Sequence, residues 1–208
     1  MGYSTMLDVI ASVLIGGLVL LILFRTNAGA AENSYDYGQD LIVQTNVTSL
    51  AETIEYDLKK VGYCTDYTKV ANPTLSIVYA DSTSIKFLSD TSKSNNPYWT
   101  GDGKIDTIYY YLDANSNAFK NSPNPNFKYL HRIINGNTAG ATLWPVTQFS
   151  LLYFNSLGDT LSFPIQNFSL INSMQVTLQV QNDAPYNSNF QTAIWKQFTV
   201  ISPNLSKR

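Results

Sequence analysis

Few side chains in this sequence of 208 residues are of the types that carry out catalysis. His131 is its one histidine and Cys64 its one cysteine, which excludes a two-histidine metal site, an internal disulfide and a thiol-based metal cluster. The sequence contains no G-x-S-x-G, P-loop or G-x-G-x-x-G pattern. We expect His131 to be a partly exposed strand residue and Cys64 a buried residue without chemistry. We predict neither an enzyme nor a cofactor.

One acidic segment faintly resembles a calcium-binding loop. Asp102, Asp106 and Asp113 follow one another closely, but an EF-hand loop needs acids at alternating positions and a terminal Glu. Lys104 occupies the middle position here, and no such Glu follows. We interpret Gly101-Asp102-Gly103 as a β-turn that enters a strand. Asp102 and Asp106 remain weak candidates for calcium, and no metal site is predicted.

The most unusual ionisable residue is Asp8, which stands at the edge of the uncharged apolar run 9–24. A helix of these 16 residues covers about 24 Å, a little less than a hydrocarbon layer of about 30 Å. Met6 and Leu7 close much of the gap if Asp8 is neutralised or paired. Because a bare carboxylate is costly at this depth, Asp8 either has a partner or lies solvated, without a role, among the headgroups.

The charge of the chain argues against nucleic acid as a partner. The formal net charge is -2, and 13% of the residues are charged. A protein that binds nucleic acid through its phosphates would show a basic excess.

Residues 40–62 carry apolar side chains at helical spacing, which predicts an amphipathic helix. The apolar stripe consists of Val43, Val47, Leu50, Ala51, Ile54, Leu58 and Val61. The charged residues that mostly fall on the other faces are Glu52, Glu55, Asp57, Lys59 and Lys60. Gly62 is the expected C-terminal stop. The preceding segment 26–39 contains Gly29 and Gly38, so it is either a kinked helix or a melted linker.

From residue 74 the apolar pattern changes to a period of two, and β-branched and aromatic residues dominate. The candidate strands, separated by turn-rich pieces, are 75–79, 84–88, 105–112, 127–134, 146–154, 172–180 and 192–201. One N-terminal helix followed by a largely antiparallel sheet is an α+β fold. Alternation along 105–112 places Tyr110 on one face and Tyr109 and Tyr111 on the other.

Three interpretations of the first 30 residues remain open. Ala28-Gly29-Ala30 is a cleavage pattern for a secretory signal peptide, although the residues before the apolar run contain no Lys or Arg. A simple single-pass anchor is the second, with an orientation that the lone Arg25 specifies poorly. The third rests on Gly2-Tyr3-Ser4-Thr5-Met6-Leu7-Asp8 and the apolar run behind it. This start resembles type IV pilins and type II secretion pseudopilins.

The resemblance implies that a prepilin peptidase cleaves between Gly2 and Tyr3. Asp8 takes the place of the family's acid, one position later and as Asp rather than Glu. It would then pair with the N-terminal amine of a neighbouring subunit. In the assembled filament, equivalent helices pack together and bury Val9, Leu14, Leu18, Leu21 and Phe24.

Later phrases extend the resemblance along the chain. Their order is similar to that in large-headed minor pilins and pseudopilins, such as the J-type subunit of type II secretion. These phrases are GDGKIDTIYYYLD at 101–113, YLHRIINGN at 129–137 and VTQFSLLYFNSLGD at 146–159. The implied pilin-like organisation is a membrane and assembly helix at 1–30, an amphipathic helix at 31–62 and a β-rich head at 63–208.

The resemblance also implies a function, that of a non-enzymatic subunit of a type IV pilus or a type II secretion pseudopilus. Before assembly it is a single-pass protein of the bacterial inner membrane with its head outside the cytoplasm. Its partners are other pilin-like subunits, membrane lipid, an assembly platform and the prepilin peptidase. The alternative is a secreted or membrane-tethered β-rich binding or adhesion domain with a signal peptide or a simple anchor.

Overall fold

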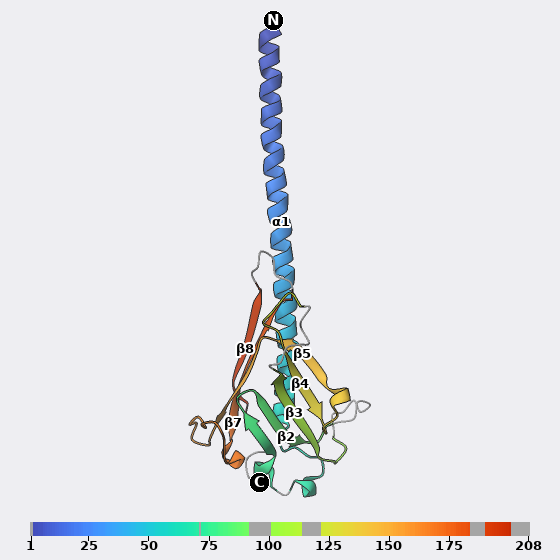
Figure 1. The fold of residues 1–208 in the computed structure, drawn as a ribbon, viewed down its shortest axis with the longest axis vertical. Helices are drawn as coiled ribbons and strands as arrows, with labels where there is room; N and C mark the ends of the chain where they lie inside the picture. The colour runs from blue at the N-terminus through green and yellow to red at the C-terminus, as the bar shows by residue number, and fades with distance from the viewer. Residues whose placement is uncertain (1, 71, 92–100, 114–121, 184–189, 201–208) are drawn as a thin grey trace.

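The computed structural model describes residues 2–70, 72–91, 101–113, 122–183 and 190–200. The chain has an α+β fold, in which one long N-terminal helix leads into a head of antiparallel strands (Figure 1). Helix α1 runs without interruption from Gly2 to Lys59, which at 1.5 Å per residue is about 87 Å. Its first half extends beyond the head, and its second half packs on the head (Figure 1).

The segment 26–39 is therefore helical, and the melted linker is wrong. Gly29 and Gly38 each lower helix propensity by about 1 kcal/mol. They lie inside a helix that is already nucleated on both sides, and extending such a helix is far less costly than starting one. The apolar first half and the head-packing second half thus form a single rod.

Two antiparallel sheets make up the head, where the sequence predicted one. The larger sheet has the order β1-β2-β3-β4-β5, and the smaller has the order β6-β7-β8. The strands of the larger sheet are β1 (Ile77–Asp81), β2 (Ser84–Ser89), β3 (Asp106–Asp113), β4 (Lys128–Ile134) and β5 (Thr142–Val146). Those of the smaller sheet are β6 (Gln148–Phe154), β7 (Ser173–Gln181) and β8 (Thr192–Val200). The short 3-10 helices are η1 (Tyr67–Lys69), η2 (Pro73–Leu75), η4 (Thr138–Gly140) and η5 (Phe168–Leu170).

All seven predicted strands lie within two residues of observed ones, but the prediction at 146–154 does not separate the two sheets. It merges the last residue of β5 with the whole of β6, which belongs to the other sheet. The chain changes sheets at Thr147, whose backbone N–H donates to Gln179 O on β7 at 2.9 Å. The short strand β5 was missed because it contains Pro145, which lacks an N–H and fits only at a sheet edge, where β5 lies.

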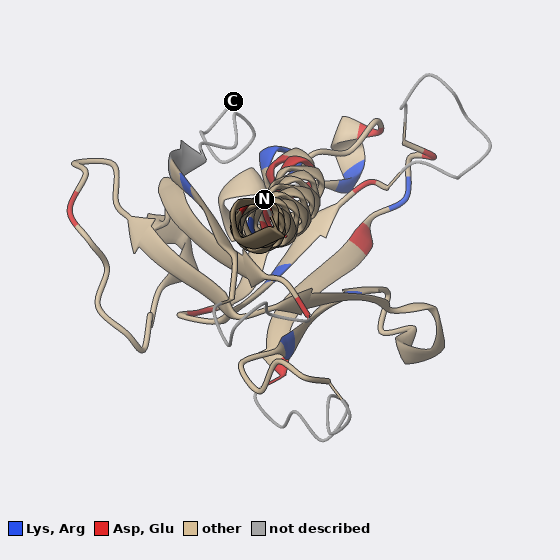
Figure 2. Cartoon of the chain, turned by 90° about the horizontal axis from the view of Figure 1, so that it is seen from above, with Lys and Arg blue, Asp and Glu red and all other residues tan. Residues whose placement is uncertain are grey.

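The core forms where α1 lies against both sheets. Figure 2, which looks down the helix, shows the sheets on one side of α1. All seven residues of the predicted apolar stripe are buried, which confirms that prediction. On the strand side the alternation also holds, since Tyr110 is fully buried while Tyr109 and Tyr111 are partly exposed on the opposite face. Within the smaller sheet, α1 packs against β7 and β8.

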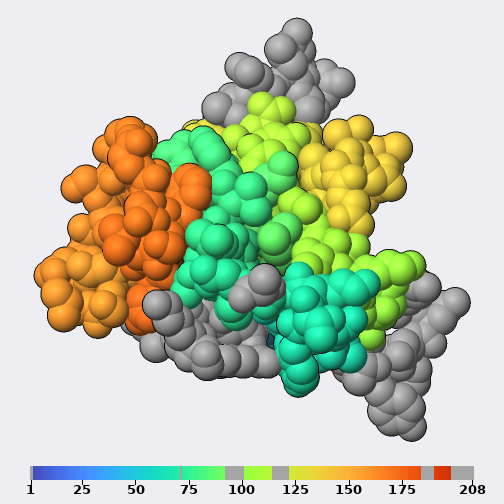
Figure 3. All heavy atoms as spheres, turned by 90° about the horizontal axis from the view of Figure 1, so that it is seen from below, coloured from blue at the N-terminus to red at the C-terminus, as the bar shows by residue number. Residues whose placement is uncertain are grey.

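Two further elements shape the ends of the head. Helix α1 ends in a turn that reaches Gly62, whose φ of 72° suits glycine and whose N–H donates to Leu88 O at 2.8 Å. Figure 3 views the far end of the head, where η5 lies beside β1 and η2. These contacts join the two sheets at the end opposite to the bare half of α1.

Candidate functional site

The first half of α1 is the most unusual surface of the molecule. All described residues from 2 to 28 are exposed, although most of them are apolar. The five predicted assembly residues are between 61% and 64% exposed, and they are Val9, Leu14, Leu18, Leu21 and Phe24. A helix that is apolar on all sides is normally buried in protein or in lipid. This half of α1 therefore requires burial in lipid or against other protein, which a single copy of the head does not provide.

This helix is long and apolar enough to cross a membrane, and none of its most apolar window is buried against the head. Three hydroxyl groups of its first half are satisfied within the helix. Thr5 donates to Gly2 O at 3.0 Å, Ser12 to Asp8 O at 2.7 Å and Thr26 to Ile22 O at 2.9 Å. Such i−3 and i−4 bonds let a polar side chain enter an apolar environment without an unpaired donor. From Gly2 to Phe24, Asp8 is the one residue with a charged side chain.

The proposed cleavage residues lie at the tip of this helix. Tyr3 is 84% exposed, and Gly2 is the first residue that the structure describes. Both positions are far from the head in Figure 1. Access to the peptide bond between them is therefore unobstructed by the described residues of this chain.

A buried ion pair ties the end of α1 to the larger sheet. The Asp57 side chain is 4% exposed, and its carboxylate accepts from Arg132 Nε at 2.6 Å and from Arg132 Nη2 at 3.2 Å. Tyr110 Oη donates to the same carboxylate at 2.6 Å. Burial raises the pKa of Tyr110, and the adjacent Asp57 charge raises it further. Burial lowers the pKa of the Arg132 guanidinium, but its interactions with Asp57 and Tyr110 outweigh burial and raise that pKa.

The sequence reasoning missed this pair because it placed Asp57 on an outer face of the helix. Asp57 is in fact buried, at the margin of the apolar stripe beside Leu58. Alternation offered a signal for its partner, because Arg132 shares a face with the buried Leu130 and lies opposite Tyr110 across the strands. The three side chains lock helix to sheet, and their hydrogen bonds to one another indicate a structural role.

A second buried carboxylate organises the loop around the calcium candidates. Asp90 is fully buried and accepts from the backbone N–H groups of Thr65 at 3.0 Å, Asp102 at 2.9 Å and Gly103 at 3.0 Å. The backbone of Gly101 lies so close that a Cβ there would be 1.9 Å from Asp90 Cγ. The turn at 101–103 therefore wraps around an acid that precedes it in the chain.

Asp102 and Asp106 are engaged in separate hydrogen bonds. Asp102 Oδ1 accepts from Lys104 N at 3.0 Å, whereas Asp106 accepts from the Thr91 hydroxyl and from Asn135 Nδ2 at 2.6 Å. Burial opposes ionisation of Asp106, but these hydrogen bonds outweigh it and lower its pKa. Within the described ranges, no group of three or more His, Cys, Asp or Glu side chains lies close enough to hold a metal ion.

The lone histidine and the lone cysteine occupy the places expected of them. The His131 side chain is 17% exposed and stacks on Tyr111 with ring centroids 4.5 Å apart. Its Nε2 lies 3.9 Å from Asp113 Oδ2. Cys64 is 2% exposed, and burial raises the pKa of its thiol, which disfavours the reactive thiolate.

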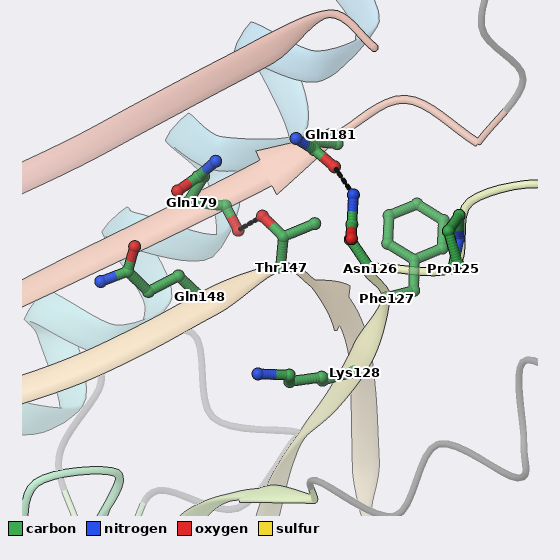
Figure 4. A pocket seen from close by; sticks show the side chains of 8 residues that line it. All are labelled: Pro125, Asn126, Phe127, Lys128, Thr147, Gln148, Gln179 and Gln181. Atoms are coloured by element: carbon green, nitrogen blue, oxygen red, sulfur yellow. Dashed lines mark hydrogen bonds between the residues drawn. The ribbon is translucent and has the colours of Figure 1, made fainter. Parts of the chain in front are cut away.

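A polar pocket of about 550 Å³ lies where β5 passes into β6 (Figure 4). Amide side chains dominate its wall, and Asn126 Nδ2 donates to Gln181 Oε1 at 3.2 Å. The Thr147 hydroxyl donates to the backbone carbonyl of Gln179 at 3.2 Å. Lys128 is the one charged residue among its lining, which contains no carboxylate, imidazole or thiol. The pocket can form hydrogen bonds with a neutral group. Its lining does not combine a nucleophile with a general base.

Comparison with known proteins adds no relative. No protein-family model, no curated protein and no solved structure matches this chain.

Proposed function

We propose that this chain is a non-enzymatic, pilin-like subunit, a minor pilin or minor pseudopilin. It is held in the bacterial inner membrane by α1 before assembly, with its head outside the cytoplasm. It then packs through α1 against equivalent helices of a type IV pilus or type II secretion pseudopilus. The observation that carries the proposal is the rod-like α1, whose apolar first half is bare while its second half is the core helix of the head.

The distribution of charge around α1 supports packing against other helices. At about 100° per residue, Arg25, Glu32, Asp36 and Asp40 fall on the same side as the buried stripe that begins at Val43. The opposite side, which faces away from the sheets in Figure 2, has no charged residue from Gly2 to Ser49. That side, which carries Val9 and Phe24 of the five predicted assembly residues, can therefore be buried in a filament without burying a charge. The other three, Leu14, Leu18 and Leu21, lie toward the head-bearing side.

The same head-free side carries small or short residues at intervals of whole turns. They are Gly16, Asn27, Ala31, Ser34, Gly38, Thr45 and Ser49. Nothing lies within 4 Å of a Cβ built at Gly16 or Gly38, so this side is open in the single copy. Small residues let helix axes approach to about 8 Å, which strengthens packing in and near lipid.

Asp8 has a place in this proposal. In lipid its carboxylate is costly, so a cationic partner from a neighbouring subunit would favour the assembled state. We propose the N-terminal amine of that neighbour, exposed after the prepilin peptidase cleaves between Gly2 and Tyr3. An assembly platform would lift the subunit from lipid into the filament.

Matched leucine substitutions in α1 test helix packing. Gly16→Leu adds bulk on the head-free side, and Ala11→Leu adds bulk on the head-bearing side, about 7.5 Å nearer the N-terminus. We expect Gly16→Leu to lower incorporation into sheared filaments about tenfold or more, and Ala11→Leu to stay within about twofold of the original chain. Immunoblots of membrane and filament fractions measure both. Equal incorporation of the two variants would refute packing through the head-free side.

The mature N-terminus separates the proposal from its alternative. Mass spectrometry should find a chain that begins at Tyr3, and Asp8→Ala should insert in the membrane with a folded head but fail to enter filaments. A chain that begins at Ala31 would instead support the secreted β-rich binding domain.

A further inference from the structure

We propose that the outer face of the larger sheet binds a pyranose sugar that carries a carboxylate, as a residue of an acidic polysaccharide. The site is a pocket of about 680 Å³ beside the turn that follows β4. It is a binding function of the head alone, so it stands whether or not α1 assembles into a filament.

The pocket lies on the side of the sheet that faces away from α1. Lys86, Tyr109 and Ile133 stand in one row across β2, β3 and β4. Their strand neighbours Phe87, Ile108 and Tyr110 point into the core, so alternation directs this row outward. Ile133 is nevertheless 6% exposed, and it forms an apolar floor beneath the pocket.

A ladder of stacked rings builds the aromatic wall. Tyr109 and Tyr111 stack with centroids 4.9 Å apart, and Tyr111 stacks on His131 with centroids 4.5 Å apart. Each ring restricts its neighbour, so Tyr109 is held in place at the pocket end of the ladder. A preorganised aromatic surface loses little conformational entropy when a ligand contacts it.

The rim is rigid for a separate reason. Asn135 and Gly136 have φ values of 52° and 70°, a tight turn in which Asn and Gly are the favoured residues. The Asn135 side chain accepts from the backbone N–H of Thr107 at 2.8 Å and donates to Asp106 at 2.6 Å. These bonds fix the edge of the pocket next to the Thr107 and Thr138 side chains.

Several polar groups of the lining have no hydrogen-bond partner among the described residues. They are the hydroxyls of Thr107, Thr138, Tyr109 and Tyr111 and the ammonium of Lys86. No carboxylate lines the pocket, so the Lys86 charge is complementary to an anion. The site thus combines an aromatic wall, an apolar floor, neutral hydroxyls and one cation.

An acidic pyranose matches each of these features. The C–H face of the sugar ring packs on an aromatic ring, the sugar hydroxyls bond with threonine and tyrosine hydroxyls, and the carboxylate pairs with Lys86. A purely apolar ligand would leave the hydroxyls unpaired, and a free phosphate would leave the aromatic wall unused. The volume lies within the range of about 300–1,000 Å³ that suits small ligands.

Binding of trigalacturonate to the full chain in a detergent without a sugar headgroup tests the proposal. Titration calorimetry and saturation-transfer NMR report affinity and the contacted ligand protons. We expect saturation of the ring C–H protons and a loss of affinity of about tenfold in Tyr109→Ala. Tyr109→Phe should stay within about threefold. Tyr129→Ala, on the same face but outside the pocket, should bind like the original chain, and thermal unfolding shows that each head is folded.

A second experiment tests whether Lys86 pairs with the carboxylate of the ligand. It uses the variant Lys86→Gln and, as a neutral ligand, maltotriose. Lys86→Gln should weaken trigalacturonate binding about tenfold, and 0.5 M salt should weaken binding to the original chain. Lys128→Gln, in the other pocket, should bind trigalacturonate with the affinity and the salt dependence of the original chain. The proposal is overturned if trigalacturonate does not bind, if maltotriose binds as tightly, or if Tyr129→Ala weakens binding as much as Tyr109→Ala.

Discussion

Removal of the Arg132 guanidinium should destabilise the head more than most single substitutions. In Arg132→Met the carboxylate of Asp57, whose side chain is 4% exposed, loses two of its three donors and keeps the Tyr110 hydroxyl. Breaking a buried ion pair from one side costs about 3–5 kcal/mol, since the remaining charge is still desolvated. For a domain of this size that free energy corresponds to a fall in Tm of about 6–20 °C.

Urea unfolding of the full chain in detergent measures this loss, with tryptophan fluorescence as the signal. The matched control is the double variant Asp57→Leu with Arg132→Met. Because the double variant leaves no buried charge, it should recover most of the free energy of unfolding. Midpoints should change while the slope of the free energy with urea stays constant.

The double variant also distinguishes an unpaired charge from a packing defect. A packing defect would persist in the double variant, whereas the unpaired buried carboxylate is absent from it. A loss of less than about 1 kcal/mol in Arg132→Met, or a double variant no more stable than Arg132→Met, would refute the reasoning.

Three further predictions concern the head. Gly101→Ala should lower the free energy of unfolding by about 1–3 kcal/mol, since its Cβ would overlap a carboxylate that three backbone N–H groups hold in place; unchanged urea midpoints would contradict this. The Cys64 thiol should react with iodoacetamide at least about tenfold more slowly in the native chain than in urea, as mass spectrometry can follow, because burial raises its pKa. Hydrogen bonds outweigh burial and lower the Asp106 pKa, so the carboxylate stabilises the head above its unfolded pKa, and this contribution is lost as pH falls through the folded pKa. Asp106→Asn should therefore show a shallower acid limb in unfolding curves, and an unchanged limb would count against it.

Periodicity was sufficient to predict the elements that bury a simple face. The stripe from Val43 to Val61 has a period near 3.6, and every member is buried. Alternation around Tyr110 was equally reliable. Both patterns are local, because a helix or a strand repeats its own geometry whatever lies opposite.

Features that depend on distant residues could not be predicted in the same way. The change of sheets at Thr147 depends on its bond to Gln179, more than 30 residues later. The burial of Asp57 depends on Arg132, which lies 75 residues away. A carboxylate near the margin of an apolar helix stripe is normally solvated. Its burial is possible here because the partner Arg132 offsets the free energy of desolvation.

The sequence by itself determined the apolar segment, the amphipathic stripe, the β-rich head and the absence of a second histidine or cysteine. These follow from composition and from local repeats, which need no knowledge of contacts. Tertiary structure decided that the two helical segments form one rod, that the strands divide into two sheets, and which buried charges pair. It also brought Lys86, Tyr109 and Ile133 into one row, since cross-strand register joins residues whose separation in the sequence carries no signal.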